Sequence, residues 1–171
     1  MKKVITMSLS QSSVRKAIKE VQRYKDDFNR KLETFVRRLA EEGVVVAKMQ
    51  IMSMPAVDTG ELLGSIDLRA GDILTNGYEY IVYTGCEYAK YVEFGTGIVG
   101  ENNPHPKPDG WQYDINHHEN RGWFYIGRDG EWHWTKGMPA RPFMYNTVID
   151  LYSKIYKIAN EVFIWWNGIW S

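Results

Sequence analysis

Apolar residues recur every three or four positions between Ser12 and Gly43, and Lys and Arg fill most of the positions between them. The apolar positions are Val14, Ile18, Val21, Phe28, Leu32, Phe35 and Leu39. This spacing predicts an amphipathic helix of about 30 residues that is capped by Ser12 or Ser13 and stops at Gly43. The apolar residues 44–54 then form a second helix or a strand, which Pro55 ends.

A shorter helix and two strands are predicted next. Asp58-Thr59-Gly60-Glu61 pairs an acceptor side chain with a carboxylate three residues later, which is typical of a helix start. Residues 66–74 and 78–83 read as strands joined through Asn76-Gly77, a strong hairpin signal. Residues 88–94 form a short turn or helix that closes on Gly95-Thr96-Gly97.

Residues 98–136 differ in composition from the rest of the chain, because they hold three prolines and all four histidines. Residues 123–126 and 132–134 are rich in aromatic side chains and flank Asp129-Gly130. This pattern predicts a second hairpin, within a segment inserted in the sheet.

The last periodic segment begins at Pro142, a residue favoured at the first position of a helix. Its apolar residues repeat at helical spacing, namely Val148, Leu151, Ile155, Ala159 and Val162. The expected fold class is therefore α+β, with a long N-terminal helix and a C-terminal helix packed on an antiparallel sheet, and an inserted aromatic hairpin. We expect residues 1–171 to form a single domain with an insertion at about 98–136.

Composition narrows the class of protein further. The chain has 171 residues, of which 44% are hydrophobic and 25% charged, and this excludes a disordered polymer. The longest apolar run, residues 162–166, is far shorter than the ~20 residues of a membrane span, so no membrane association is expected. No cleavable leader is expected either. The lone Cys86 cannot form an internal disulfide, which fits assembly in a reducing cytoplasm.

Charge is distributed unevenly although the net charge is zero. Residues 1–50 hold 12 Lys and Arg against 6 Asp and Glu, whereas residues 51–171 hold 9 against 15. The basic part is either the solvated face of a helix or a positive surface that faces an acidic partner or DNA.

The sequence contains residues that suggest two enzyme hypotheses. Asp58-Thr59-Gly60 matches the active-site triplet of aspartic proteases, in which two such carboxylates share a proton, so Asp58 could serve a homodimeric protease. The histidines could instead ligate the metal of a hydrolase: His105, His117, His118 and His133. A helix cap at Asp58, and loop histidines that hydrogen-bond or face solvent, are the simpler interpretations.

Other residue groups give weaker indications of a catalytic or ligand-binding role. The glycines around Gly95-Thr96-Gly97 lack the lysine of a phosphate-binding loop, and Cys86 reads as a small buried residue. The clustered aromatics could stack on single-stranded bases, but few cations lie among them, so hairpin packing or a protein interface is favoured. They are Trp111, Tyr113, Trp123, Tyr125, Trp132 and Trp134.

Three segments in order resemble the tail-completion or head–tail joining (neck) protein family of long-tailed bacteriophages and prophages. They begin with V-D-T-G, Y-A-K-Y-V-E and M-P-A-R-P-F. The first contains Asp58, Thr59, Gly60, Leu62 and Ser65; the second Tyr88, Ala89, Tyr91, Val92, Glu93, Gly95, Thr96 and Gly97; the third Pro139, Arg141, Pro142 and Phe143. The insertion at 98–136 is a departure from minimal members of the family.

The resemblance implies a structural virion component without a cofactor or a catalytic residue. It implies a homo-oligomeric ring, expected to be a hexamer, between the connector or stopper and the tail-tube or tail-terminator proteins. Passive contact with DNA in the channel would follow, and assembly would take place in the host cytoplasm. In the family pattern, residues 93–97 form a tight turn at the sheet edge, against which Pro142 and Phe143 anchor the last helix. Six tryptophans are candidate interface anchors: Trp123, Trp132, Trp134, Trp165, Trp166 and Trp170.

Overall fold

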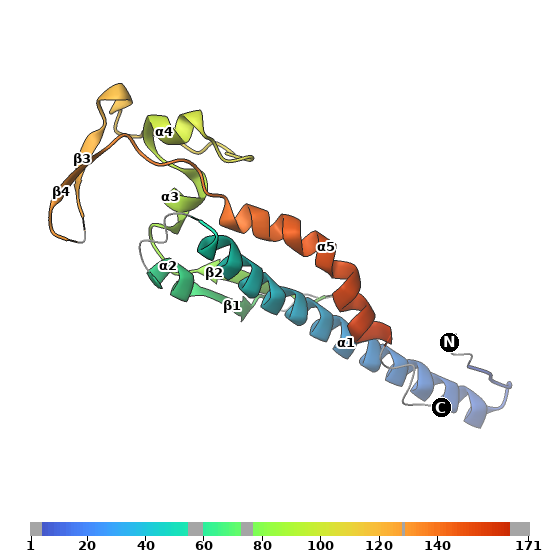
Figure 1. Cartoon of the computed structure of the whole chain (residues 1–171). Coiled ribbons are helices and arrows are strands. Elements are labelled where there is room, and N and C mark those ends of the chain that lie inside the picture. The colour runs from blue at the N-terminus through green and yellow to red at the C-terminus, as the bar shows by residue number, and fades with distance from the viewer. Residues whose placement is uncertain (1–4, 55–59, 73–76, 128, 165–171) are drawn as a thin grey trace. The chain divides into compact units, whose positions relative to one another are not determined.

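The computed structural model describes residues 5–54, 60–72, 77–127 and 129–164 (Figure 1). It confirms the α+β class, because a long N-terminal helix and a C-terminal helix occur together with two small antiparallel sheets. The elements in chain order are α1 (Gln11–Met52), α2 (Gly60–Ser65), β1 (Ile66–Ala70), β2 (Tyr80–Thr84), α3 (Ala89–Phe94), α4 (Gly97–Asn102), the 3-10 turn η1 (Glu119–Arg121), β3 (Trp123–Ile126), β4 (Trp132–Thr135) and α5 (Phe143–Ile164). None of these helices is both long and apolar enough to cross a bilayer.

Helix α1 is longer than its sequence pattern predicts. The expected stop at Gly43 is wrong, since the helix continues without a break to Met52. Burial accounts for this difference, because Val46, Ala47 and Ile51 are at most 3% exposed. Burying those side chains outweighs the roughly 1 kcal/mol that a glycine costs inside a helix. The predicted cap is also shifted, because the hydroxyl of Ser10 accepts the N–H of Ser13 at 3.3 Å.

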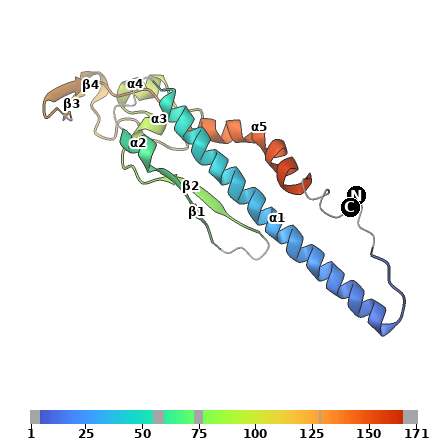
Figure 2. The same cartoon turned by 60° about the horizontal axis from the view of Figure 1, so that its bottom comes forward.

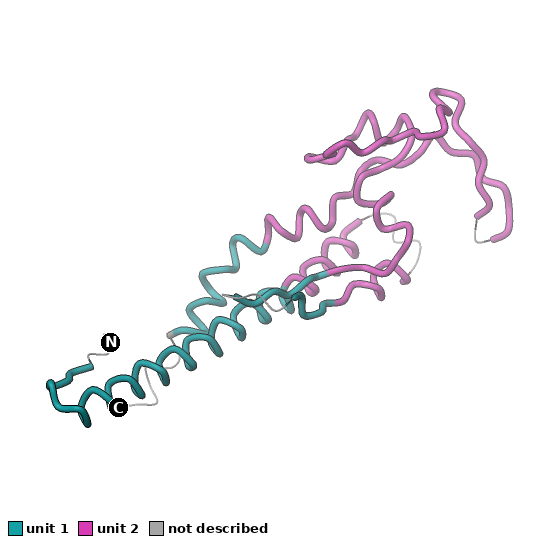
Figure 3. Tube along the Cα trace, turned by 180° about the vertical axis from the view of Figure 1, so that it is seen from behind, with its two compact units in different colours: residues 1–42, 68–82, 151–171 teal, residues 43–67, 83–150 magenta. Residues whose placement is uncertain are grey.

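The chain divides into two compact units (Figure 3). Unit 1 comprises residues 1–42, 68–82 and 151–171, and unit 2 comprises residues 43–67 and 83–150. Several elements contribute residues to both units, including α1 and α5. Whether the whole chain acts as the single domain predicted above stays a prediction.

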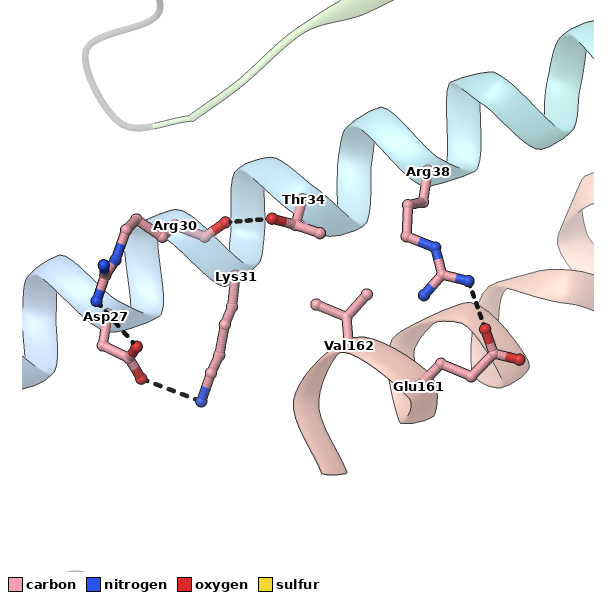
Figure 4. Close-up of a pocket in the computed structure, with 7 residues that line it drawn as sticks. All are labelled: Asp27, Arg30, Lys31, Thr34, Arg38, Glu161 and Val162. Atoms are coloured by element: carbon pink, nitrogen blue, oxygen red, sulfur yellow. Dashed lines mark hydrogen bonds and ion pairs between the residues drawn. The ribbon is translucent and has the colours of Figure 1, made fainter. Parts of the chain in front are cut away.

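In unit 1 the C-terminal half of α5 runs antiparallel to α1. The ring of Phe163 lies 6.1 Å from that of Phe28 and 6.0 Å from that of Phe35. Around this apolar contact Arg38 donates to Glu161 at 2.6 Å, as Figure 4 shows, and Lys154 pairs with Glu42. These ion pairs are partly exposed, so each of them contributes little to stability.

A cavity of about 650 Å³ lies beside this contact (Figure 4). Its charged side chains are paired with one another, since Asp27 binds Lys31 at 3.1 Å and Arg30 at 3.3 Å. We therefore interpret the cavity as a solvated groove between α1 and α5.

Strands β1 and β2 pair in a sheet but are shorter than the predicted runs. The turn residue Asn76 lies outside the described residues. At the described end of the hairpin, the N–H of Gly71 donates to the carbonyl of Glu79 at 2.8 Å. Ile66, at the start of β1, is 2% exposed and belongs to the core.

The predicted aromatic hairpin is confirmed. Strands β3 and β4 pair antiparallel, with Phe124 opposite Trp134 and Ile126 opposite Trp132. At the tip, the N–H of Gly127 donates to the carbonyl of Glu131 at 2.8 Å. Figures 1 and 2 show the hairpin projecting from the rest of unit 2.

Candidate functional site

The second and third segments of the family pattern lie side by side in unit 2. Thr96 and Met138 form an antiparallel bridge, in which the N–H of each residue donates to the carbonyl of the other at 2.9 and 3.1 Å. The N–H of Arg141 donates to the carbonyl of Val92 at 2.8 Å. We call residues 88–97 and 138–145 together the motif junction. Backbone hydrogen bonds thus join two segments that are 40 residues apart in the chain.

Glu93 is the central side chain of the motif junction. Its carboxylate is buried, with the residue only 7% exposed, and accepts the N–H groups of Met144 and Tyr145, each at 2.9 Å. Both N–H groups belong to the first turn of α5, where a helix has no internal acceptors. A carboxylate is also favoured near the positive end of the helix dipole. Glu93 of α3 therefore caps the N-terminus of α5.

His105 completes this buried polar cluster and is 5% exposed. Its Nε2 lies 3.1 Å from Oε1 of Glu93, and the N–H of Lys107 donates to its Nδ1 at 2.9 Å. Nδ1 also lies 2.7 Å from the carbonyl oxygen of Lys107, so this ring nitrogen faces both a donor and an acceptor. An ionised Glu93 carboxylate only accepts, and Nε2 then carries a proton and donates to it. The ring also packs 4.6 Å from that of Phe94. The inserted segment is thereby attached to the motif junction at its first histidine.

Phe143 and Trp111 provide apolar cover for the motif junction. Phe143, the first residue of α5, is 1% exposed. Trp111 stacks on Phe94 with ring centroids 5.0 Å apart, and its Nε1 donates to the carbonyl of Gly95 at 2.9 Å. A dry environment of this kind strengthens the hydrogen bonds of the buried carboxylate.

Two glycines permit the close backbone approach. Gly95 has φ +82°, and a Cβ there would lie 2.6 Å from the backbone nitrogen of Ala140. Gly97 has φ +59°, and a Cβ there would lie 2.3 Å from the carbonyl oxygen of Lys136. Larger residues would therefore strain the backbone and separate the paired segments.

The first segment of the family pattern is described only in part. Asp58 and Thr59 lie outside the described residues, so the structure gives the protease hypothesis no support. Gly60 begins α2, in which Leu62 is 5% exposed. The hydroxyls of Ser65 and Thr84 lie 2.6 Å apart. These contacts hold α2 against the end of β2.

The four histidines do not converge on one site. His117 is exposed with φ +54°, His118 pairs with Asp114 at 2.9 Å, and His133 pairs with Asp129 at 2.9 Å. Within the part of the chain that the structure describes, no three His, Cys, Asp or Glu side chains are grouped to hold a metal ion. The metal-hydrolase hypothesis therefore has no observation in its favour.

Local hydrogen bonds keep two of the histidine-paired carboxylates ionised. The backbone N–H of Glu119, followed by contacts with His118, lowers the pKa of Asp114 to about 2. The backbone N–H of Glu131 and the side chain of His133 lower the pKa of Asp129. Both carboxylates stabilise turns in the inserted segment.

The hairpin differs from the motif junction because its large side chains are exposed. Residues that pair across an antiparallel ladder lie on the same side of it, so one side carries only apolar residues. We call these residues the apolar hairpin face, and their exposed fractions are 64% for Phe124, 62% for Ile126, 66% for Trp132 and 52% for Trp134. Trp123 and Tyr125 lie on the opposite side. The predicted anchors Trp165, Trp166 and Trp170 lie outside the described residues.

The sequence did not reveal the capping role of Glu93. The available signal had two parts. Glu93 is a charged residue within the apolar run Tyr91-Val92-Glu93-Phe94, and a helix begins much later in the chain, after Pro142. Nothing in that pattern identifies Met144 and Tyr145 as the donors, because only the tertiary fold brings them to the carboxylate.

The chain matches a known protein family over part of its length. Residues 15–95 match the HK97-gp10-like family, described as "Bacteriophage HK97-gp10, putative tail-component". No curated protein and no solved structure matches the chain. The matched residues include α1 from residue 15 onward, both strands of the first sheet and the second segment of the family pattern through Gly95. This match over residues 15–95 is consistent with the resemblance to a phage tail-completion or neck protein, and it includes the first segment of the family pattern and the second through Gly95.

Proposed function

We propose that this protein is a structural component of a phage virion that completes the tail or joins it to the head. In this proposal six copies form a ring between the connector or stopper and the tail-tube or tail-terminator proteins. The protein assembles in the host cytoplasm, and DNA passes through the ring without sequence-specific contact.

The apolar hairpin face carries the proposal. Four large side chains that are each more than half exposed are unusual on a hairpin of eight paired residues, and such a patch is typical of a protein contact. Aromatic residues often provide most of the binding energy at interfaces. The family match supports the same role, because the matched family is described as a "putative tail-component" of a bacteriophage.

The buried interactions of the motif junction favour a structural role over a catalytic one. Glu93 and His105 are the buried polar pair, and their hydrogen-bonding groups are already occupied by backbone and by each other. A general acid or base needs access to a substrate proton, and neither side chain has it. We therefore assign these residues to the support of α5 and of the start of the inserted segment.

The test is the deletion of the coding sequence from a phage that carries this chain, followed by electron microscopy of the particles. We expect heads and tails to accumulate unjoined, and wild-type protein supplied in trans to restore complete virions. A Phe124→Ser/Trp132→Ser variant should not restore them, whereas a control with two exposed serines replaced, Ser8→Ala/Ser53→Ala, should. Complete, infectious particles without the protein would contradict the proposal.

A further inference from the structure

The N-terminal segment of α1, residues 11–25, carries a strongly basic face in unit 1. Arg15, Lys19 and Arg23 are spaced by four residues and lie on one side of the helix. With Lys16 and Lys25 they outnumber the single acidic residue of this segment, Glu20, and the net charge is +4.

None of these five cations forms an ion pair with any of the described residues. This contrasts with the next turns of the same helix, where Arg30 and Lys31 bind Asp27. The segment also exposes apolar residues on another side, with Ile18 62% and Val21 54% exposed. A helix with a basic face and exposed apolar side chains is suited to bind a surface that is both acidic and apolar.

Unit 2 contains a surface of that kind, which we call the acidic pocket. It is a cavity of about 760 Å³ in the inserted segment, and three carboxylates line it: Glu101, Asp114 and Glu119. No Lys or Arg is among its lining residues. Ile98, Trp111 and Ile115 provide apolar walls, and Ile115 is 64% exposed.

The acidic pocket offers charged groups to a ligand. Tyr113 also lines the pocket, but its hydroxyl oxygen is buried and lies out of reach of a ligand. Glu101 and Glu119 are exposed, and their carboxylates are available to cations.

We infer that the N-terminal segment of α1 in one copy binds the acidic pocket of the next copy. The inference rests on the proposed ring, and it specifies which surfaces meet there. The two surfaces are different patches of the same chain, so their contact is heterologous and closes into a ring when the rotation between copies allows it. Charge complementarity selects this partner over a second α1, because two segments of charge +4 repel each other.

The test exchanges the charges of the two surfaces. The helix variant is Lys19→Glu/Arg23→Glu, and the pocket variant is Glu101→Lys/Glu119→Lys. The helix variant lowers the charge of the segment from +4 to zero, and the pocket variant replaces two of the three carboxylates of the pocket by cations. Each variant alone therefore loses the attraction at every contact, and we expect its self-association at low salt to fall by about tenfold or more in sedimentation experiments. In a mixture the new glutamates of one variant can meet the new lysines of the other, and unchanged helices can meet unchanged pockets, so association should return.

A control pair, Lys90→Glu/Lys107→Glu, changes the net charge by the same amount as the helix variant at cations elsewhere and should associate like the wild type. Circular dichroism and thermal unfolding establish that each variant is folded. Three outcomes overturn the inference: variants that associate normally, a mixture that stays dissociated, or a wild type that is monomeric at its highest soluble concentration and low salt. The virion-complementation experiment is independent of all three, so the tail-component role can stand if this contact fails.

Discussion

The motif junction and the apolar hairpin face belong to the same unit but differ in burial. Large side chains are buried in the junction and exposed on the hairpin face. In the junction Phe143 is 1% exposed and Glu93 has acceptors filled by two helix N–H groups. On the hairpin, Phe124 and Trp132 are about two-thirds exposed. The difference indicates that the junction stabilises the fold, whereas the hairpin is available for contacts with other molecules.

The largest expected effect is a difference in stability between alanine variants of two phenylalanines. Phe143→Ala should lower the free energy of unfolding by about 3–5 kcal/mol, because it leaves a cavity in a packed core. Phe124→Ala, the same substitution on the hairpin, should change it by less than about 1 kcal/mol. Urea unfolding followed by circular dichroism measures both values. Equal effects would remove the distinction between the two regions.

A second substitution tests the cap of α5. Glu93→Ala leaves the N–H groups of Met144 and Tyr145 and one ring nitrogen of His105 without their partner. We expect a loss of about 2–4 kcal/mol, since buried unsatisfied groups retain their full desolvation cost. The matched control is Glu87→Ala, which removes an exposed glutamate just before α3. If thermal unfolding gives the two variants the same midpoint, the capping role of Glu93 is wrong.

A smaller effect is expected from the close backbone approach. Gly95→Ala should destabilise the protein by about 1–3 kcal/mol, because φ is +82° and the new Cβ would contact the backbone of residue 140. Gly85→Ala is the control, since nothing lies within 4 Å of a Cβ placed there. Amide hydrogen exchange of Thr96 and Met138 reports on the bridge and should accelerate only in the Gly95 variant.

The smallest expected effect is the loss of the contribution of Asp114 to stability at low pH. The folded-state pKa of Asp114 is lowered to about 2, so the folded protein binds fewer protons there than the unfolded chain. The contribution of Asp114 to stability is therefore complete above its ordinary pKa of 3.8 and is lost as the pH falls from about 4 to about 2. NMR signals of His118 should shift over this range in the wild type. The Asp114→Asn variant should not show that step, and an identical titration in both proteins would contradict the assignment.

Local sequence patterns determined most of the elements of this fold. Period-3.6 spacing identified α1 and α5, and Asp129-Gly130 between aromatic runs identified the hairpin β3–β4. These signals work because they arise from interactions within a few residues of each other. The same reasoning misplaced the end of α1 at Gly43, where burial of more distant residues outweighs a local glycine penalty.

The site depended on information that a local pattern does not contain. The family resemblance placed Pro142 and Phe143 against the turn at residues 93–97, but it did not identify the Glu93 carboxylate as the cap of the last helix. The carboxylate of Glu93 meets its donors about 50 positions along the chain, and His105 joins them from the insertion. Such contacts form only when the tertiary fold brings the unpaired N–H donors of α5 next to a buried carboxylate.

The sequence by itself determined the α+β class, the two long helices, the aromatic hairpin and the charge difference between the two parts of the chain. Only the tertiary structure decided which of these apolar and charged side chains are buried. It placed Phe143 in the core and left Trp132 exposed, although both belong to strongly apolar or aromatic stretches. The physical reason is that hydrophobicity favours burial of every such residue, whereas packing and backbone hydrogen bonding allow it only for those whose neighbours fit.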